Sequence, residues 1–145
     1  MTDQEKIQRA WSVNEAFGDS DWTAFAAALA SDAVYEEPAT GRRTEGPAAN
    51  VTLAKEWKTA FPDAHGRLDR AYVSGETVIM EITWEGTQTG PFALPSGTLP
   101  PTGKRIRVPA VMITTLKDGK ISRQRHHLDI LTMLTQLGAL PGSAM

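Results

Sequence analysis

The spacing of apolar residues changes near residue 62, and this change limits the folds open to the chain. Before that point, apolar side chains recur every three or four positions over 2–17 and 47–61, which predicts amphipathic helices. After it, apolar and polar side chains alternate, most clearly over 77–88, which predicts strands. Helices followed by mostly antiparallel strands predict an α+β fold, with the helices packed on one face of a curved sheet.

Glycine, proline and an Asp-Gly pair mark where the predicted elements end. The predicted helices cover 2–17, 22–29, 47–61 and 130–137. The predicted strands cover 33–37, 67–73, 77–88, 105–116 and 121–129, with a tight hairpin at 117–120 and a long loop over 89–103. We find no internal repeat, so we expect one domain over 1–145, with 139–145 as a loose tail.

Charge and cysteine content exclude several classes of protein. The chain has 15 basic and 17 acidic residues, and this balance argues against a nucleic-acid binder, which needs a basic face, and against a polybasic membrane-surface protein. It has no cysteine, which excludes disulfides, thiolate nucleophiles and cysteine-ligated metals. The N-terminus lacks the apolar segment of a secretory signal, and no apolar run reaches the roughly 20 residues of a membrane helix. We therefore expect a cytoplasmic protein without a membrane or nucleic-acid partner.

Asp129 is the first candidate for a catalytic residue. It stands between Leu128 and Ile130, where the last predicted strand meets the last predicted helix. Apolar surroundings raise the pKa of a carboxyl group toward values that are useful for proton transfer. An aspartate at the start of a helix also commonly caps it, so the pattern leaves both roles open.

Two further polar residues accompany Asp129 on the last strand. Alternation places His127 and Arg125 on the same face as Asp129, and His126 on the other face with Leu128. His127 could take part in proton transfer together with Asp129, and Arg125 could bind the substrate, although a strand histidine is more often structural. The three histidines and the scattered acids show no ligand spacing, so we expect no metal site.

Two asparagines interrupt otherwise apolar helical stripes. If the helices cover a pocket, the amides of Asn14 and Asn50 could hold a substrate oxygen; otherwise the stripes turn outward at these positions. Four large side chains are expected to form core or pocket wall: Trp57, Phe61, Trp84 and Met112.

Several short segments, taken in order, resemble one protein family. They are EEPATG at 36–41 with Gly46, WKTAFPD at 57–63, GTQTGPF at 86–92, PPTG at 100–103, HHLD at 126–129 and LTQLG at 134–138. Together they extend over residues 5–140 and resemble the SnoaL-like polyketide cyclase or ester cyclase family, within the nuclear-transport-factor-2-like superfamily.

The resemblance implies a cone-shaped α+β barrel of three helices and a curved, mostly antiparallel sheet, often a homodimer. It also implies ring closure by intramolecular aldol condensation of a small hydrophobic carbonyl compound, without cofactor or metal. The family's acid/base aspartate matches Asp129, and Asn50 is the nearest counterpart of its polar residue on the third helix.

The same fold also hosts other functions, which stay open as alternatives. One is a non-catalytic binder of a hydrophobic metabolite. Another is an epoxide or lactone hydrolase, whose Asp-Arg-Asp relay could draw two members from Arg125 and Asp129. A steroid isomerase would need a tyrosine and a protonated aspartate in the pocket, and because the chain has only Tyr35 and Tyr72, this alternative is the weaker one.

Overall fold

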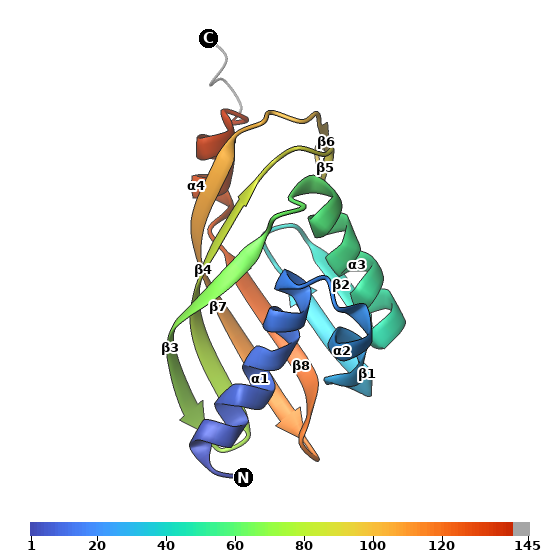
Figure 1. Ribbon diagram of the computed structural model, residues 1–145, viewed down its shortest axis with the longest axis vertical. Helices are drawn as coiled ribbons and strands as arrows, with labels where there is room; N and C mark the ends of the chain where they lie inside the picture. The colour runs from blue at the N-terminus through green and yellow to red at the C-terminus, as the bar shows by residue number, and fades with distance from the viewer. Residues whose placement is uncertain (141–145) are drawn as a thin grey trace.

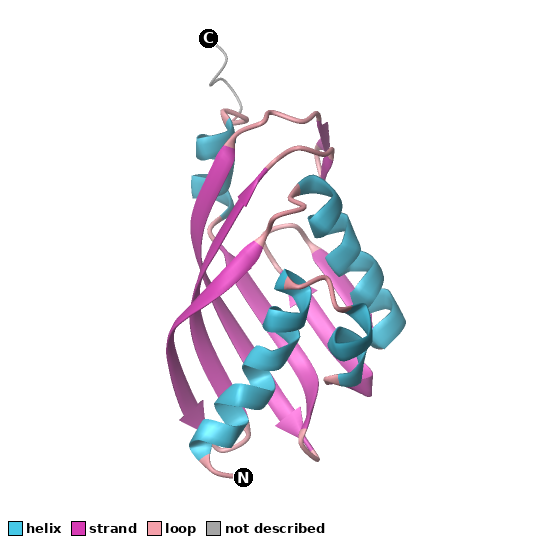
Figure 2. Cartoon of the chain, viewed as in Figure 1, coloured by secondary structure: helices cyan, strands magenta, loops and turns pink. Residues whose placement is uncertain are grey.

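The computed structural model describes residues 1–140, which form a layer of helices on one face of a twisted sheet (Figures 1 and 2). The helices are α1 (Asp3–Gly18), α2 (Trp22–Ala27), α3 (Pro47–Ala60) and α4 (Ile130–Leu137). The strands are β1 (Leu29–Glu37), β2 (Arg42–Glu45), β3 (His65–Ser74), β4 (Thr77–Thr87), β5 (Phe92–Leu94), β6 (Gly97–Leu99), β7 (Arg105–Lys117) and β8 (Lys120–Leu128). The predicted α+β class is confirmed.

The main sheet has six strands in the order β2-β1-β8-β7-β4-β3. The pair β1 and β8 is parallel, and all other neighbours are antiparallel. Because β2 and β3 stay at opposite edges, the sheet is open and not closed into the barrel that the resemblance implied. Helices α1, α2 and α3 cover one face, and α4 packs beside β7 (Figure 1).

Local signals explain where most helices begin and end. The Thr2 hydroxyl accepts a hydrogen bond from the Glu5 N–H at 3.1 Å, and the Glu5 carboxylate accepts one from the Thr2 N–H at 3.0 Å. This reciprocal cap fixes the start of α1. Helix α3 begins at Pro47, and α4 ends at Gly138, whose left-handed φ of 67° suits glycine.

The structure contains short strands that the sequence pattern did not predict. Strand β2 lies in the expected turn after residue 38, and the β5–β6 hairpin lies in the expected loop over 89–103. That loop is held by the fully buried Gln88, whose amide group donates to the carbonyls of Gly90, Leu99 and Pro100 and accepts from Thr102. A single buried amide of this kind leaves no periodic signal in a sequence.

Two apolar clusters form the core. One joins α1 and α2 to the sheet, and the other joins the end of α3 to β5, β7 and α4. Ala139, expected in the loose tail, packs against the second cluster and donates its N–H to the Leu134 carbonyl, whereas 141–145 lie outside the described residues. Within residues 1–140, no helix combines the length and hydropathy that a membrane span needs.

Candidate active site

A cavity of about 90 Å³ lies between the helices and the sheet. Its wall is mostly apolar and includes six of the residues singled out from the sequence: Asn14, Asn50, Trp57, Phe61, Trp84 and Met112. The structure therefore brings all six to one hollow, whereas their binding of a substrate stays a prediction.

The polar part of the cavity wall centres on His126 of β8 and Tyr35 of β1. The Nδ1 atom of His126 lies 2.8 Å from the Tyr35 hydroxyl, and the indole N–H of Trp84 donates to His126 Nε2 at 3.1 Å. Because an indole N–H can only donate, Nε2 must be the accepting nitrogen of the neutral imidazole. Nδ1 therefore carries the proton and donates it to the Tyr35 oxygen.

The hydrogen-bond chain continues from Tyr35 to Glu37, a carboxylate that the protein encloses completely. The Tyr35 hydroxyl donates to Glu37 Oε2 at 2.5 Å, and the Trp57 indole N–H donates to the same oxygen at 2.9 Å. The Thr40 hydroxyl donates to the other oxygen, Oε1, at 2.7 Å. Three donors thus hold Glu37 behind the cavity wall, and one of them, Tyr35, connects it to His126.

Burial sets the protonation states of His126 and Tyr35 in this hydrogen-bond chain. Burial, with a smaller contribution from the nearby His127, lowers the pKa of His126 from 6.5 to about 3, so the imidazole is neutral at pH 7. Burial also raises the pKa of Tyr35 well above its ordinary value, and the neighbouring Glu37 carboxylate adds to this rise. The phenol is therefore protonated at pH 7, as its hydrogen bond to Glu37 requires.

Asp129 lies outside the cavity and caps α4. Its carboxylate accepts the Thr132 N–H at 3.0 Å and the Thr132 hydroxyl at 2.6 Å. These hydrogen bonds lower the pKa of Asp129, whereas an apolar pocket would raise it. The expectation of an apolar site with a raised pKa was therefore wrong, and the structure shows the helix cap that the sequence had left open.

His127 and Arg125 also point away from the cavity. Alternation along β8 does place His127 on the side of Asp129, and both line a hollow on the outer face of the sheet. That side is exposed, and His126 and Gln124 face the helices instead. Arg125 and Asp129 therefore provide no part of an Asp-Arg-Asp relay in the cavity.

The sequence reasoning missed His126, Tyr35 and Glu37 as functional candidates. The signal for His126 was present, because alternation set it beside the apolar Leu128 on the face opposite to Asp129. The same alternation puts Ala33, Tyr35 and Glu37 on one face of β1. Only the pairing of β1 with β8 shows that these two faces meet.

Asn50 lines the cavity but has little hydrogen-bonding capacity left for a ligand. Its amide nitrogen donates to the carbonyls of Ala33 at 3.2 Å and Gly46 at 2.7 Å, and its oxygen accepts the Thr44 hydroxyl at 2.9 Å. Asn50 therefore joins the start of α3 to β1 and β2. The resemblance had suggested a ligand-binding role at this position.

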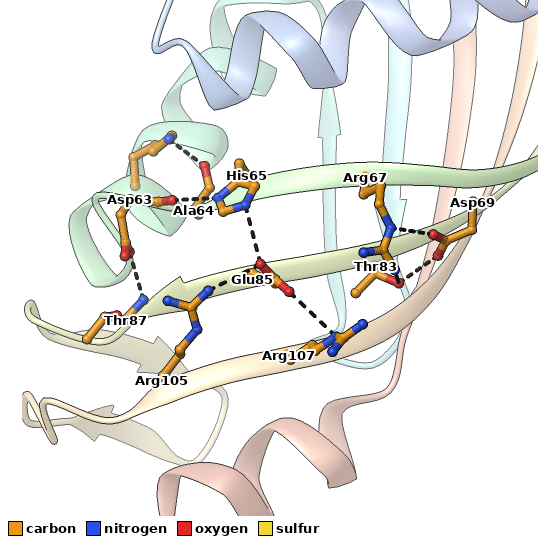
Figure 3. Close-up of polar contacts among 11 residues, drawn as sticks. Asp63, Ala64, His65, Arg67, Asp69, Thr83, Glu85, Thr87, Arg105 and Arg107 are labelled. Carbon is orange, nitrogen blue, oxygen red and sulfur yellow. Dashed lines mark hydrogen bonds and ion pairs between the residues drawn. The ribbon is translucent and has the colours of Figure 1, made fainter.

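A second polar cluster lies on β3, β4 and β7 (Figure 3). Glu85 forms ion pairs with Arg105 at 3.2 Å and Arg107 at 3.5 Å, and its carboxylate also lies 3.4 Å from Nε2 of His65. The three side chains around Glu85 are more than half exposed, so each contact contributes little to stability. Within the described residues, no three His, Asp or Glu side chains lie close enough to share a metal ion.

The fold and the cavity define an α+β domain with a mostly apolar hollow between its helices and its sheet, the kind of place where small-molecule sites occur. The chain belongs to the SnoaL-like polyketide cyclase family, whose family model matches residues 5–137. No curated protein matches the chain significantly.

Solved structures share this fold at low sequence identity. TsrD from Streptomyces laurentii is 23% identical, with 97% of this chain and 99% of that chain covered and a TM-score of 0.82. A SnoaL-like protein from Jannaschia sp. CCS1 is 20% identical over 95% and 94% of the two chains, with a TM-score of 0.83. An LEH-like epoxide hydrolase of M. tuberculosis is 21% identical over 92% and 90%, with a TM-score of 0.71. At these identities the likeness extends to the fold alone.

Proposed function

We propose that this chain is an acid/base enzyme that removes a proton next to a carbonyl group of a small apolar compound and so promotes aldol-type ring closure. The observation that carries the proposal is the chain of hydrogen bonds from His126 through Tyr35 to Glu37, which begins at the cavity wall and ends on a buried carboxylate. Membership of the SnoaL-like family supports the reaction class.

In the first step, Nε2 of His126 takes a proton from the carbon beside the carbonyl, and the C–H electron pair becomes an enolate. The Nδ1 proton then moves to the Tyr35 oxygen, and the Tyr35 hydroxyl proton moves to Glu37. Bound substrate takes the place of the Trp84 N–H on Nε2, and this N–H is then available to the enolate oxygen.

The relay explains how a histidine with a pKa of about 3 can act as a base. A lone imidazolium in this apolar cavity would be strongly disfavoured at pH 7. When the proton continues to Glu37, the buried negative charge moves from the carboxylate to the enolate, and no additional charge is created. The enolate then attacks a second carbonyl of the folded substrate, and the new alkoxide recovers the proton from Glu37 through the same chain.

The experiment follows proton removal directly. Phenylacetone, an apolar enolisable ketone, is incubated with the protein in deuterium oxide, and loss of its methylene protons is followed by NMR. Tyr35→Phe keeps His126 and removes the relay, so we expect its exchange rate to fall at least about 100-fold. Tyr72→Phe is the matched control, because Tyr72 also donates to a glutamate, Glu81, but on the exposed outer face.

Unchanged exchange in Tyr35→Phe would rule out the relay. Saturable binding of phenylacetone by the wild-type protein with no exchange above buffer would contradict the enzyme and favour the alternative of a non-catalytic binder. The homodimer expected from the resemblance stays a prediction.

A further inference from the structure

Two amide side chains flank the sulfur atom of Met112 in the cavity wall. Asn14 comes from α1 and Gln124 from β8, and they are only 5% and 3% exposed. The Gln124 amide nitrogen donates to Met112 Sδ at 3.1 Å, and the Asn14 amide nitrogen donates to it at 3.7 Å. The thioether can only accept, so it fixes which end of each amide faces the sulfur.

Among residues 1–140, no donor forms a hydrogen bond to the oxygen atom of either amide. Each residue makes only its bond to Met112 among the side-chain hydrogen bonds of residues 1–140. In that part of the chain, Thr114 Oγ1 is the one side-chain polar atom that is fully enclosed and lacks a partner. Neither amide oxygen is fully enclosed, and both residues line the cavity, so we infer that a ligand would reach these oxygens from the cavity.

An acceptor oxygen that is nearly buried and lacks a donor is unfavourable, so a ligand that supplies a donor gains a hydrogen bond there. The sequence suggested that Asn14 could hold a substrate oxygen, but its amide nitrogen is directed to Met112. The free groups are two acceptors, which need a hydrogen-bond donor. An ammonium group would also donate, but it would enter a mostly apolar wall as an uncompensated charge, so a neutral hydroxyl fits better.

We propose that Asn14 and Gln124 form an acceptor pair that selects substrates carrying a hydroxyl group away from the reacting carbonyl. Gln124 and His126 are two residues apart on one face of β8, so their Cα atoms are about 7 Å apart and the acceptor pair lies to one side of the base. The substrate class is therefore an enolisable carbonyl compound with a distal hydroxyl. This inference rests on the proposed function, in which the reacting carbon of the substrate lies at Nε2 of His126.

The test compares two ligands of nearly equal shape, para-hydroxyphenylacetone and para-methylphenylacetone, which differ in the donor group. Dissociation constants are measured by tryptophan fluorescence, and methylene exchange is measured by NMR. We expect the wild-type protein to bind the hydroxyl compound at least about tenfold more tightly, the equivalent of one net hydrogen bond.

The variants Asn14→Leu and Gln124→Met keep side-chain volume and remove one acceptor each. Each should reduce the preference for the hydroxyl compound about threefold or more, with affinity for the methyl compound kept or improved. Gln4→Met is the matched control on an exposed turn of α1 and should keep the full preference. Circular dichroism checks that each variant folds. A third variant, Met112→Leu, keeps both amide groups but removes the sulfur acceptor that fixes their orientation.

Equal affinity of the wild-type protein for the two compounds, or an unchanged preference in every folded variant, would overturn the acceptor pair. Exchange without a hydroxyl preference would overturn it while supporting the proposed function. A hydroxyl preference that depends on Asn14 and Gln124, without any exchange, would support the acceptor pair and contradict the proposed chemistry.

Discussion

Nδ1 of His126 lies 2.8 Å from the phenolic oxygen of Tyr35, although 91 residues separate the two in the chain. They meet because β8 and β1 are parallel neighbours in the sheet. The contact joins a cavity-facing imidazole to a carboxylate behind the cavity wall. Its consequences can be measured in stability as well as in turnover.

Replacement of Tyr35 by phenylalanine should destabilise the protein. The change leaves the buried His126 Nδ1–H without its acceptor and removes one of the three donors to Glu37. We expect a loss of about 1–3 kcal/mol in the free energy of unfolding, measured by urea denaturation. Tyr72→Phe, on the outer face, should change it by less than about 0.5 kcal/mol; equal losses in the two variants would argue against the buried chain.

The pH dependence of stability should report the buried neutral His126. Its pKa falls from 6.5 to about 3 on folding, so between these pH values the unfolded chain binds a proton at His126 and the folded protein does not. Stability from this residue is complete above pH 6.5 and is lost as the pH falls from 6.5 toward 3, at about 1.4 kcal/mol per pH unit. His126→Gln should lose this part of the slope in urea titrations between these limits, whereas His127→Gln should keep it.

Asp129→Asn separates the capping role from the catalytic role expected at first. Because the carboxylate caps α4 outside the cavity, we expect phenylacetone exchange within about twofold of wild type. Asp129→Ala, which removes the cap, should cost about 1 kcal/mol of stability. Loss of exchange in a fully folded Asp129→Asn protein would restore Asp129 as a catalytic candidate.

Gly66 gives Trp84 room to reach His126. A Cβ atom at position 66 would lie 2.9 Å from Trp84 Cζ3, so Gly66→Ala must displace the indole that donates to His126 Nε2. We expect about 1–3 kcal/mol of destabilisation and a shift in tryptophan fluorescence. At Gly18 the nearest atom would be 3.7 Å away, so Gly18→Ala should fold with a wild-type spectrum; an unchanged spectrum in Gly66→Ala would contradict the packing argument.

Lys58 connects two chain segments through its buried ammonium group. Nζ donates to the carbonyls of Gly18 at 3.1 Å, Pro62 at 3.4 Å and Ala64 at 2.7 Å, and burial lowers its pKa. Lys58→Met keeps the apolar stem and leaves these carbonyls without their donor. We expect a loss of about 1–3 kcal/mol in thermal or urea unfolding. The exposed Lys55 provides the comparison, because Lys55→Met should leave stability nearly unchanged.

Periodicity determined much of the fold before any tertiary contact was known. The spacing of apolar residues over 2–17 and 47–61 predicted α1 and α3 within one or two residues, and alternation over 77–88 predicted β4. These patterns succeed because a helix or strand buries one face, and burial selects apolar side chains at that period. For the same reason the sequence identified Trp57 and Trp84 as wall or core.

Tertiary structure alone decided which polar residues meet. Nothing in the local pattern states that β1 pairs in parallel with β8, and that pairing brings Tyr35 to His126 and connects Glu37 to the cavity. The role of Asp129 likewise depended on where the chain leaves the sheet. Strand β8 ends at Leu128, so Asp129 is the cap of α4 and not a strand residue that faces the cavity. A sequence determines which faces are buried because burial acts on each element separately, whereas a hydrogen-bonded site depends on positions that only the assembled sheet provides.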